Sequence, residues 1–246
     1  MVKFYSSNYS YDYPFPAVSL AYFLRYPNPY SRHVASTDTL SRHFDPVTQR
    51  LTTVRLHLKR SRLPPAVLKL LPRSTNASNG APTTDGDGRA QSFILEKSVV
   101  DVKEGWMETE SRNLDWETVL SVIERHTYRR PDTGTIEAPG DQTDVSVSVT
   151  LKSRIGEQLR KRRQRWGEHA TSSSVLGGEE QQAKQGWFSS WSNGAVRSAI
   201  ESISLQRTEK SQPKARQGMS VVLDRLRQGG VQAVLEGMRR DREVVV

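Results

Sequence analysis

Basic side chains gather on one short segment of this sequence. Six of them occur between positions 55 and 73 with no acidic residue among them: Arg55, Lys59, Arg60, Arg62, Lys69 and Arg73. Guanidinium and ammonium groups at this density favour binding of phosphate or carboxylate groups. Within the same segment, residues 63–72 (LPPAVLKLLP) carry large apolar side chains, and an apolar tip beside basic residues is typical of a membrane-touching segment. An ordinary loop that packs against a sheet is the alternative.

Catalytic motifs are scarce in the rest of the chain. The sequence has no Gly-rich phosphate loop, no Gly-x-Ser-x-Gly turn and no His-Glu-x-x-His pair. It has no cysteine, which excludes disulfides, thiolate catalysis and cysteine-ligated metals. The nearest approaches to a metal site, His43 with Asp45 and Asp85 with Asp87, are better explained as polar turns. We therefore expect a protein that is not an enzyme and that needs no metal or cofactor.

The whole chain is basic. Its 246 residues carry 36 Lys and Arg against 27 Asp and Glu, a net charge of +9, so we expect an anionic partner. A nucleic-acid-binding protein would explain the run RKRRQR at 160–165, but no nucleic-acid-binding motif accompanies it and the apolar segment would be left unexplained. No apolar stretch is long enough for a transmembrane helix, and residues 1–16 lack the features of a targeting segment.

Helical spacing of apolar residues marks the two ends of the chain. It predicts a short first helix between Pro16 and Pro27, and a long C-terminal helix over 187–229 that is kinked or restarted near Pro213. Residues 230–246 are expected to be a tail.

Alternation with a period of two predicts the elements in between. Strands are expected over 51–60, 93–102, about 107–113, 119–128 and 145–151, as an antiparallel meander with one covered face. In the strand 51–60 we expect the apolar residues to face the core, and Arg55, His57 and Lys59 to face water.

Two polar stretches interrupt the predicted domain. Residues 73–90 have the composition of a flexible surface loop, and residues 154–186 form a basic and polar insertion. The domain is therefore expected to comprise residues 1–153 and the helix 187–229.

Short motifs in a fixed order reveal a resemblance to a known family. RYPNP at 25–29, followed by His33, Val34 and the polar positions up to Arg42, resembles the signature of the PRELI (Slowmo/PRELI-like) domain family. Four further motifs follow in the family's order: Ser98 to Asp101, Arg112 to Asp115, Thr127-Tyr128, and Arg216 to Met219.

The resemblance implies a fold and a function. The fold would be α+β: a curved antiparallel sheet of about six or seven strands, a short first helix, a lid loop and a long C-terminal helix that together enclose a lipid pocket. The function would be lipid transfer in the mitochondrial intermembrane space, peripheral on membranes. The motif YPNPY at 26–30 is most similar to the branch that carries phosphatidic acid for cardiolipin synthesis, and phosphatidylserine, the cargo of a sister branch, is the alternative. Family members form heterodimers with a small twin-cysteine-motif protein, so such a partner is expected.

The resemblance also implies which residues bind the lipid phosphate. The family's arginine at the end of the first helix corresponds to Arg25, for which a simple helix-capping cation is the alternative. Arg60 and Arg62 flank the lid, and Arg207 and Lys214 come from the long helix.

The family's lid corresponds to residues 63–72. Its apolar members are expected to contact the membrane: Leu63, Val67, Leu68, Leu70 and Leu71. Ala66, Phe93 and Ile203 stand where the family often has tryptophan, so docking is expected to be weaker or to use other residues.

Overall fold

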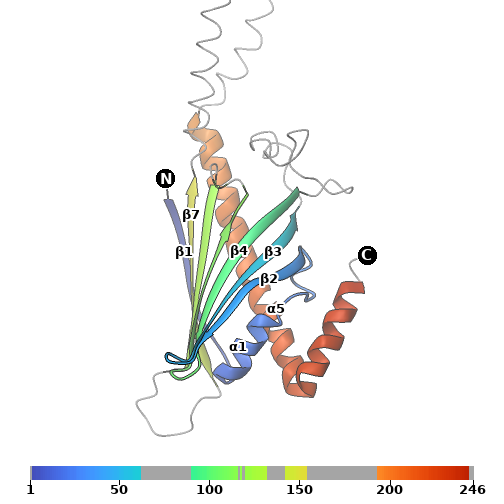
Figure 1. Ribbon diagram of the computed structural model, residues 1–246. Coiled ribbons are helices and arrows are strands. Elements are labelled where there is room, and N and C mark those ends of the chain that lie inside the picture. Colours follow the sequence, from blue (N-terminus) through green and yellow to red (C-terminus); the bar gives the residue numbers. More distant parts are fainter. Residues whose placement is uncertain are drawn as a thin grey trace, which may run out of the picture.

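Seven strands form one antiparallel sheet in the computed structural model (Figure 1). Their spatial order is β1-β7-β6-β5-β4-β3-β2, so β2 to β7 form a meander and β1 pairs with the last strand. The strands are β1 Val2–Tyr11, β2 Val34–Asp45, β3 Arg50–Ser61, β4 Ala90–Asp101, β5 Trp106–Asn113, β6 Leu120–Arg129 and β7 Thr143–Ser153. The structure describes residues 2–61, 90–115, 117, 120–131, 142–153 and 193–243, with the helical backbone alone for 193–205.

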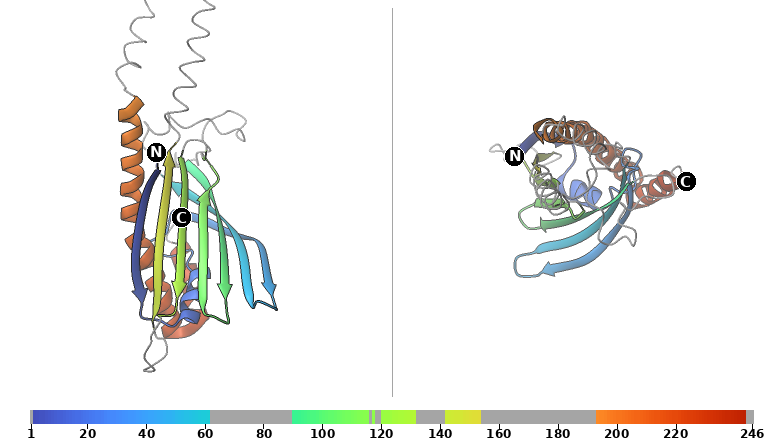
Figure 2. Two further views of the ribbon diagram at one scale, coloured as in Figure 1. Left: turned by 90° about the vertical axis from the view of Figure 1, so that its left-hand side faces the viewer. Right: turned by 90° about the horizontal axis from the view of Figure 1, so that it is seen from above.

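Two helices accompany the sheet in the described part of the chain, α1 (Phe15–Phe23) and α5 (Asn193–Glu243). Seen from above, the strands form an arc, α5 lies across its open side, and α1 lies between them (Figure 2). Helix α1 contacts both α5 and β6. The predicted fold class, a curved antiparallel sheet with a short first helix and a long C-terminal helix, is confirmed.

The hydrophobic core lies at the α1 end of the sheet. Strand β7 alternates as predicted, with Val145, Val147, Val149 and Leu151 buried and the intervening positions largely in water. Helix α1 and the second half of α5 each bury one stripe of apolar residues against this face. The stripe on α1 is Phe15, Val18, Ala21 and Tyr22, and that on α5 is Met219, Val222, Leu223 and Val234.

Strand β3 faces the opposite way from its prediction. Thr53, Arg55 and His57 are buried, whereas the apolar residues that alternate with them are only half-buried. The prediction was wrong because it assumed that the inner face of a strand is its apolar face. Burial of Arg55 is tolerated because Glu96 on the neighbouring strand β4 supplies an opposite charge.

Helix α5 also differs from its prediction. Its backbone dihedrals stay helical through Pro213, which is exposed, and become non-helical only at Gly229 and Gly230. The kink expected near Pro213 is therefore wrong, and the turn occurs where Gly230 adopts a φ of 62°, a conformation that glycine reaches without strain. Beyond this turn the segment expected to be a tail is helical to Glu243 and contributes the fully buried Val234 to the core.

Side-chain contacts join helix α5 to strand β1 and to the residues that follow β1 in the chain. The Tyr13 hydroxyl donates a hydrogen bond to Asp224 Oδ1 at 2.6 Å. The Arg216 guanidinium lies 4.8 Å from the centroid of the Tyr9 ring. These contacts lie along the edge strand β1, whereas β2 at the other edge pairs only with β3 among the described strands.

Candidate functional site

Polar residues form rows across the inner face of the sheet, the face toward α1 and α5. The strand register places one row on β3 to β6: Thr53, Ser98, Thr109 and His126. The adjacent row holds Arg55, Glu96, Ser111 and Glu124. The inner face of a sheet is normally apolar, so polar rows at this position need specific partners and point to a binding function.

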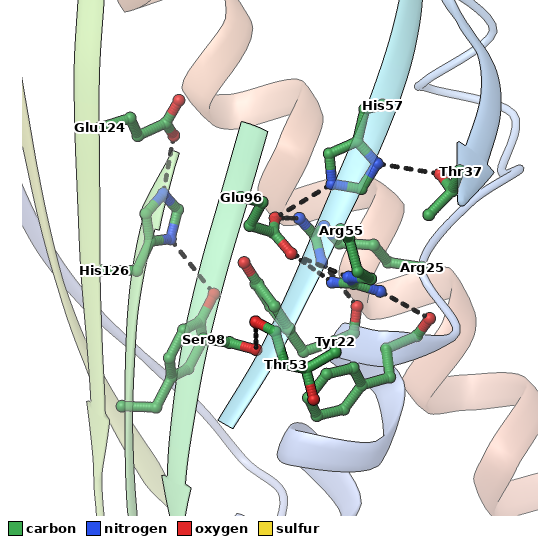
Figure 3. Close-up of polar contacts among 12 residues, drawn as sticks. Tyr22, Arg25, Thr37, Thr53, Arg55, His57, Glu96, Ser98, Glu124 and His126 are labelled. Atoms are coloured by element: carbon green, nitrogen blue, oxygen red, sulfur yellow. Dashed lines mark hydrogen bonds and ion pairs between the residues drawn. The ribbon is translucent and has the colours of Figure 1, made fainter. Parts of the chain in front are cut away.

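The carboxylate of Glu96 stands at the centre of a buried cluster (Figure 3). Arg55, directly opposite on β3, donates to Glu96 Oε1 from Nε at 2.9 Å and from Nη2 at 2.5 Å. Arg25 donates from Nη2 to Glu96 Oε2. Burial alone would raise the pKa of Glu96, but the charges of Arg25 and Arg55 hold that pKa well below its usual range, so the carboxylate is ionised.

The end of helix α1 positions Arg25. Its Nη1 donates to the Tyr22 carbonyl at 2.7 Å, and its guanidinium lies 3.7 Å from the centroid of the Tyr22 ring and 4.5 Å from that of Tyr26. Arg25 therefore satisfies a carbonyl of the last helical turn, as the capping alternative expected, and also reaches Glu96 inside the sheet. Its contact with a lipid phosphate stays a prediction.

His57 completes the cluster. Its Nδ1 lies 2.9 Å from Thr37 Oγ1, and its Nε2 lies 3.3 Å from Glu96 Oε2 without forming a hydrogen bond. Burial lowers the pKa of His57 more than Glu96 raises it, so the imidazole is neutral near pH 7.

We call Arg25, Arg55, His57 and Glu96 the arginine–glutamate cluster. Two guanidinium charges face one carboxylate in it, which leaves one net positive charge. The side chains of Arg55, His57 and Glu96 are almost fully buried, and that of Arg25 is 14% exposed. A positive charge in such a place favours an anion as its partner.

A close contact with α5 holds the loop that follows Arg25. Asn28 is buried, and its Nδ2 donates to the Arg25 carbonyl at 2.6 Å while its Oδ1 accepts from the Tyr30 N–H at 2.9 Å. Gly218 of α5 lies against this side chain, and a Cβ atom at position 218 would stand 2.6 Å from Asn28 Oδ1. The glycine therefore lets the helix approach the loop.

The added methyl group of Gly218→Ala is expected to cost about 1–3 kcal/mol, the usual cost of forcing extra volume into a fitted contact. The higher helix propensity of alanine offsets about 1 kcal/mol of this cost, so the free energy of unfolding should fall by up to about 2 kcal/mol. Urea unfolding followed by circular dichroism measures the change. Gln217→Ala, at the exposed neighbouring position, is the matched control and is expected to change stability little. A Gly218→Ala protein at least as stable as the wild type would contradict the tight contact.

A second polar cluster joins the sheet to α5. Glu124 Oε1 lies 2.6 Å from His126 Nε2 and accepts a hydrogen bond from Gln212 Nε2 at 2.9 Å. Desolvation would raise the pKa of Glu124, but the contacts with His126 and Gln212 and the charge of Lys59 lower that pKa to about 2.

The lowered pKa of Glu124 predicts that its contacts with His126 and Gln212 stabilise the protein less at acid pH. The pKa of Glu124 in the folded protein, about 2, lies below its ordinary value of 4.5, so its stabilisation is complete above that value and is lost as the pH falls toward 2. The side chain is 30% exposed, so solvent limits the contribution to on the order of 1–2 kcal/mol. Thermal unfolding of the wild type and of Glu124→Gln from about pH 7 to about pH 3 should show a difference in Tm that shrinks in acid. A difference that does not vary with pH would rule this out.

His33 has a lowered pKa, and two lysines contribute to it, Lys59 on β3 and Lys214 on α5. Desolvation by the surrounding chain, followed by the positive charges of both lysines, lowers the pKa of His33 to about 4, although part of its side chain is exposed. Lys59, which the sequence analysis placed in water, is half-buried.

The structure describes four of the expected site residues and places one of them, Arg25, in the buried cluster. Lys214 acts on His33. Arg60 at the end of β3 and Arg207 on α5 are exposed. Arg62 and the lid residues lie outside the described residues: Leu63, Val67, Leu68, Leu70 and Leu71.

Sequence reasoning missed Arg55, His57 and Glu96 as parts of one site. Polar residues at alternate positions of two neighbouring strands, Arg55 and His57 on one and Glu96 on the other, were the available signal. Their opposite charges indicate that the two polar faces pair with each other.

Membrane-spanning and metal-binding groups are not found in the described ranges. No helix there is long and apolar enough to cross a membrane. Nor do those ranges bring three or more histidine, aspartate or glutamate side chains together around a position for a metal ion.

Known proteins are similar to this chain over most of its length. Residues 16–167 match the model of the PRELI-like family. The chain is 30% identical over 227 residues to "Protein UPS1, mitochondrial" of Saccharomyces cerevisiae, covering 92% of this chain and 95% of that protein. It is 41% identical over 107 residues to "Protein ups1 homolog" of Schizosaccharomyces pombe, covering 44% of this chain and 53% of that protein. It is 31% identical over 128 residues to "PRELI domain-containing protein 1, mitochondrial" of Mus musculus, covering 52% of each chain.

Proposed function

This chain belongs to the PRELI-like family, and from that premise we propose that it carries phosphatidic acid between the outer and inner mitochondrial membranes. Working from the intermembrane space, it would supply the precursor of cardiolipin. The yeast UPS1 and the mouse relative are mitochondrial by name, which supports a mitochondrial location for this chain. The protein acts as a carrier rather than an enzyme, since lipid transfer makes and breaks no covalent bond.

The net positive charge of the arginine–glutamate cluster is the observation that carries the choice of cargo. A phosphate monoester bears a charge of about −1.5 to −2 near pH 7, and guanidinium groups bind its oxygens in pairs. Lys59 and Lys214 add positive charge beside His33. A phosphodiester headgroup has fewer free oxygens and less charge, so this arrangement favours the monoester of phosphatidic acid.

The inner face around the arginine–glutamate cluster suits an amphiphile. On the side of the core, the register aligns Val100, Met107 and Tyr128 in one row. On the other side, the inner positions of β4, β6 and β7 carry further apolar residues: Ile94, Val122 and Leu151. A phosphate at the cluster would thus have the half-buried Ile94 and Val122 beyond it for the acyl chains, whereas Val100, Met107 and Tyr128 already pack in the core. About thirty methylenes at about 0.8 kcal/mol each amount to roughly 20 kcal/mol or more, the barrier that a carrier must remove.

Three further assignments belong to this proposal and follow the family's pattern. Residues 63–72 form a lid that contacts an anionic membrane surface. Arg60, Arg62 and Arg207 guide the phosphate or hold that surface. A small twin-cysteine-motif protein binds the chain as its heterodimer partner.

A vesicle assay tests the proposed function. The protein, with its partner, is mixed with donor vesicles that contain labelled phosphatidic acid, phosphatidylserine or phosphatidylcholine, and with unlabelled acceptor vesicles. We expect phosphatidic acid to move fastest, and mass spectrometry to find it bound to the purified complex. Preferred transfer of phosphatidylserine would assign the chain to the sister branch, and RNA binding without lipid transfer would overturn the proposal.

A further inference from the structure

The arginine–glutamate cluster contains an acidic group that an anion-binding site does not require. We propose that Glu96 is a resident counterion, which occupies Arg25 and Arg55 while the carrier is empty and competes with the headgroup phosphate once lipid enters. Glu96 thereby keeps the binding loose enough for release at the receiving membrane. This inference rests on the proposed function and assigns the release step to one residue.

The geometry shows that phosphate and Glu96 need the same donors. Arg55 presents its Nε and Nη2 edge, the pair that binds an oxyanion, to Glu96 Oε1, and its Nη1 already donates to the Phe23 carbonyl at 3.1 Å. Arg25 divides its two Nη atoms between the Tyr22 carbonyl and Glu96 Oε2. A phosphate that takes the Nε and Nη2 edge of Arg55, or the Nη2 donor of Arg25, must therefore displace Glu96 from it.

The cluster also contains a second partner for the displaced carboxylate. His57 Nε2 is buried, lies 3.3 Å from Glu96 Oε2 and makes no hydrogen bond. When Arg25 turns to a phosphate, a small rotation of Glu96 lets its carboxylate form a directed hydrogen bond with this nitrogen. The carboxylate, only 2% exposed, then keeps a partner although water does not reach it.

A purely structural role for Glu96 makes the opposite prediction. If the carboxylate only holds the two arginines in position, its loss will weaken lipid binding. If it competes with the phosphate, its loss will strengthen lipid binding and slow release.

Glu96→Gln separates the two roles, with Glu110→Gln as the matched control. Glu110 lies on the outer face of β5, where its side chain is 43% exposed and pairs with Arg125. We expect Glu96→Gln to bind short-chain phosphatidic acid about tenfold tighter than the wild type, which is at the low end of the effects measured for close pairs of charges. Release of the bound lipid to vesicles should be slower by a similar factor. Phosphatidylcholine binding and the Glu110→Gln control should match the wild type. Unchanged or weaker binding of phosphatidic acid by Glu96→Gln would overturn the inference.

Loss of a buried carboxylate can also destabilise the fold, so two more measurements accompany the first. The Tm of Glu96→Gln should be lower than that of the wild type without lipid, and should rise further than the wild-type Tm when phosphatidic acid is added. If Glu96→Gln does not fold, Glu96→Asp is the variant to test, because its shorter carboxylate should reach only one of the two arginines. Phosphatidic acid should then again bind more tightly than to the wild type. Wild-type or weaker binding by Glu96→Asp would refute the counterion role. A wild type that binds no phosphatidic acid overturns the proposed function itself, whereas normal wild-type binding without an effect at Glu96 overturns only this inference.

Discussion

Arg25→Gln is expected to lower the rate of phosphatidic acid transfer by about a hundredfold. Removal of one partner from a buried, hydrogen-bonded charge pair costs about 3 kcal/mol, and each 1.4 kcal/mol is a factor of ten. Glu96 keeps Arg55 as its partner in this variant, so the fold should survive. The vesicle assay measures the rate, and thermal unfolding checks that the protein remains folded.

Arg129→Gln is the matched control for this change. Arg129 lies on β6 with its side chain 64% exposed, and its loss should leave transfer as it is. Arg25→Glu is less informative than Arg25→Gln, because it places a second carboxylate against Glu96 in a buried site. Wild-type transfer by a folded Arg25→Gln protein would remove Arg25 from the phosphate site.

Arg55→Met is expected to lower the free energy of unfolding by about 3–5 kcal/mol, the usual cost of breaking a buried ion pair from one side. The methionine fills similar space but leaves Glu96 Oε1 and the Phe23 carbonyl without donors. Urea unfolding measures the loss.

The double variant Arg55→Met with Glu96→Gln tests the cause. If the loss of donors at Glu96 Oε1 dominates the cost, the double variant will be more stable than the sum of the two single changes implies. Additive losses, or a loss below about 1 kcal/mol for Arg55→Met, would mean that the pair contributes little to the fold.

The sequence placed strands β3 to β7 within three residues at each end, including β5 and β6, whose inner faces are largely polar. Strand β7 was placed within two residues at each end because its valines face the core and its serines do not. Strand β1 was missed because its inner face is built from tyrosine and serine, although Tyr5, Tyr9 and Tyr11 recur at even spacing. The bounds of strand β2 were not predicted, because this edge strand is mostly exposed and its sequence shows no alternating apolar face.

The candidate site was only partly predictable for a related reason. The family motif located Arg25, because the RYPNP residues are contiguous in the chain. The contact between Arg55 and Glu96 depends on the register of two strands that residues 62–89 separate in the sequence, and composition does not fix that register. The orientation of β3 was therefore predicted wrongly, and the arginine–glutamate cluster was missed, for the same reason. In both cases opposite charges that pair inside the sheet allow polar side chains to be buried.

The segment after the turn at Gly229 and Gly230 is part of the folded domain and cannot be removed without loss of core contacts. The residues beyond it return Val234 to the interior, and Asp241 near the chain end binds Arg225 at 2.7 Å. A protein truncated at Gly229 would leave a void beside Met219 and Leu223. The helical residues from Val231 to Glu243 therefore help to fill the core, so a truncation or an inserted tag should lie beyond residue 243.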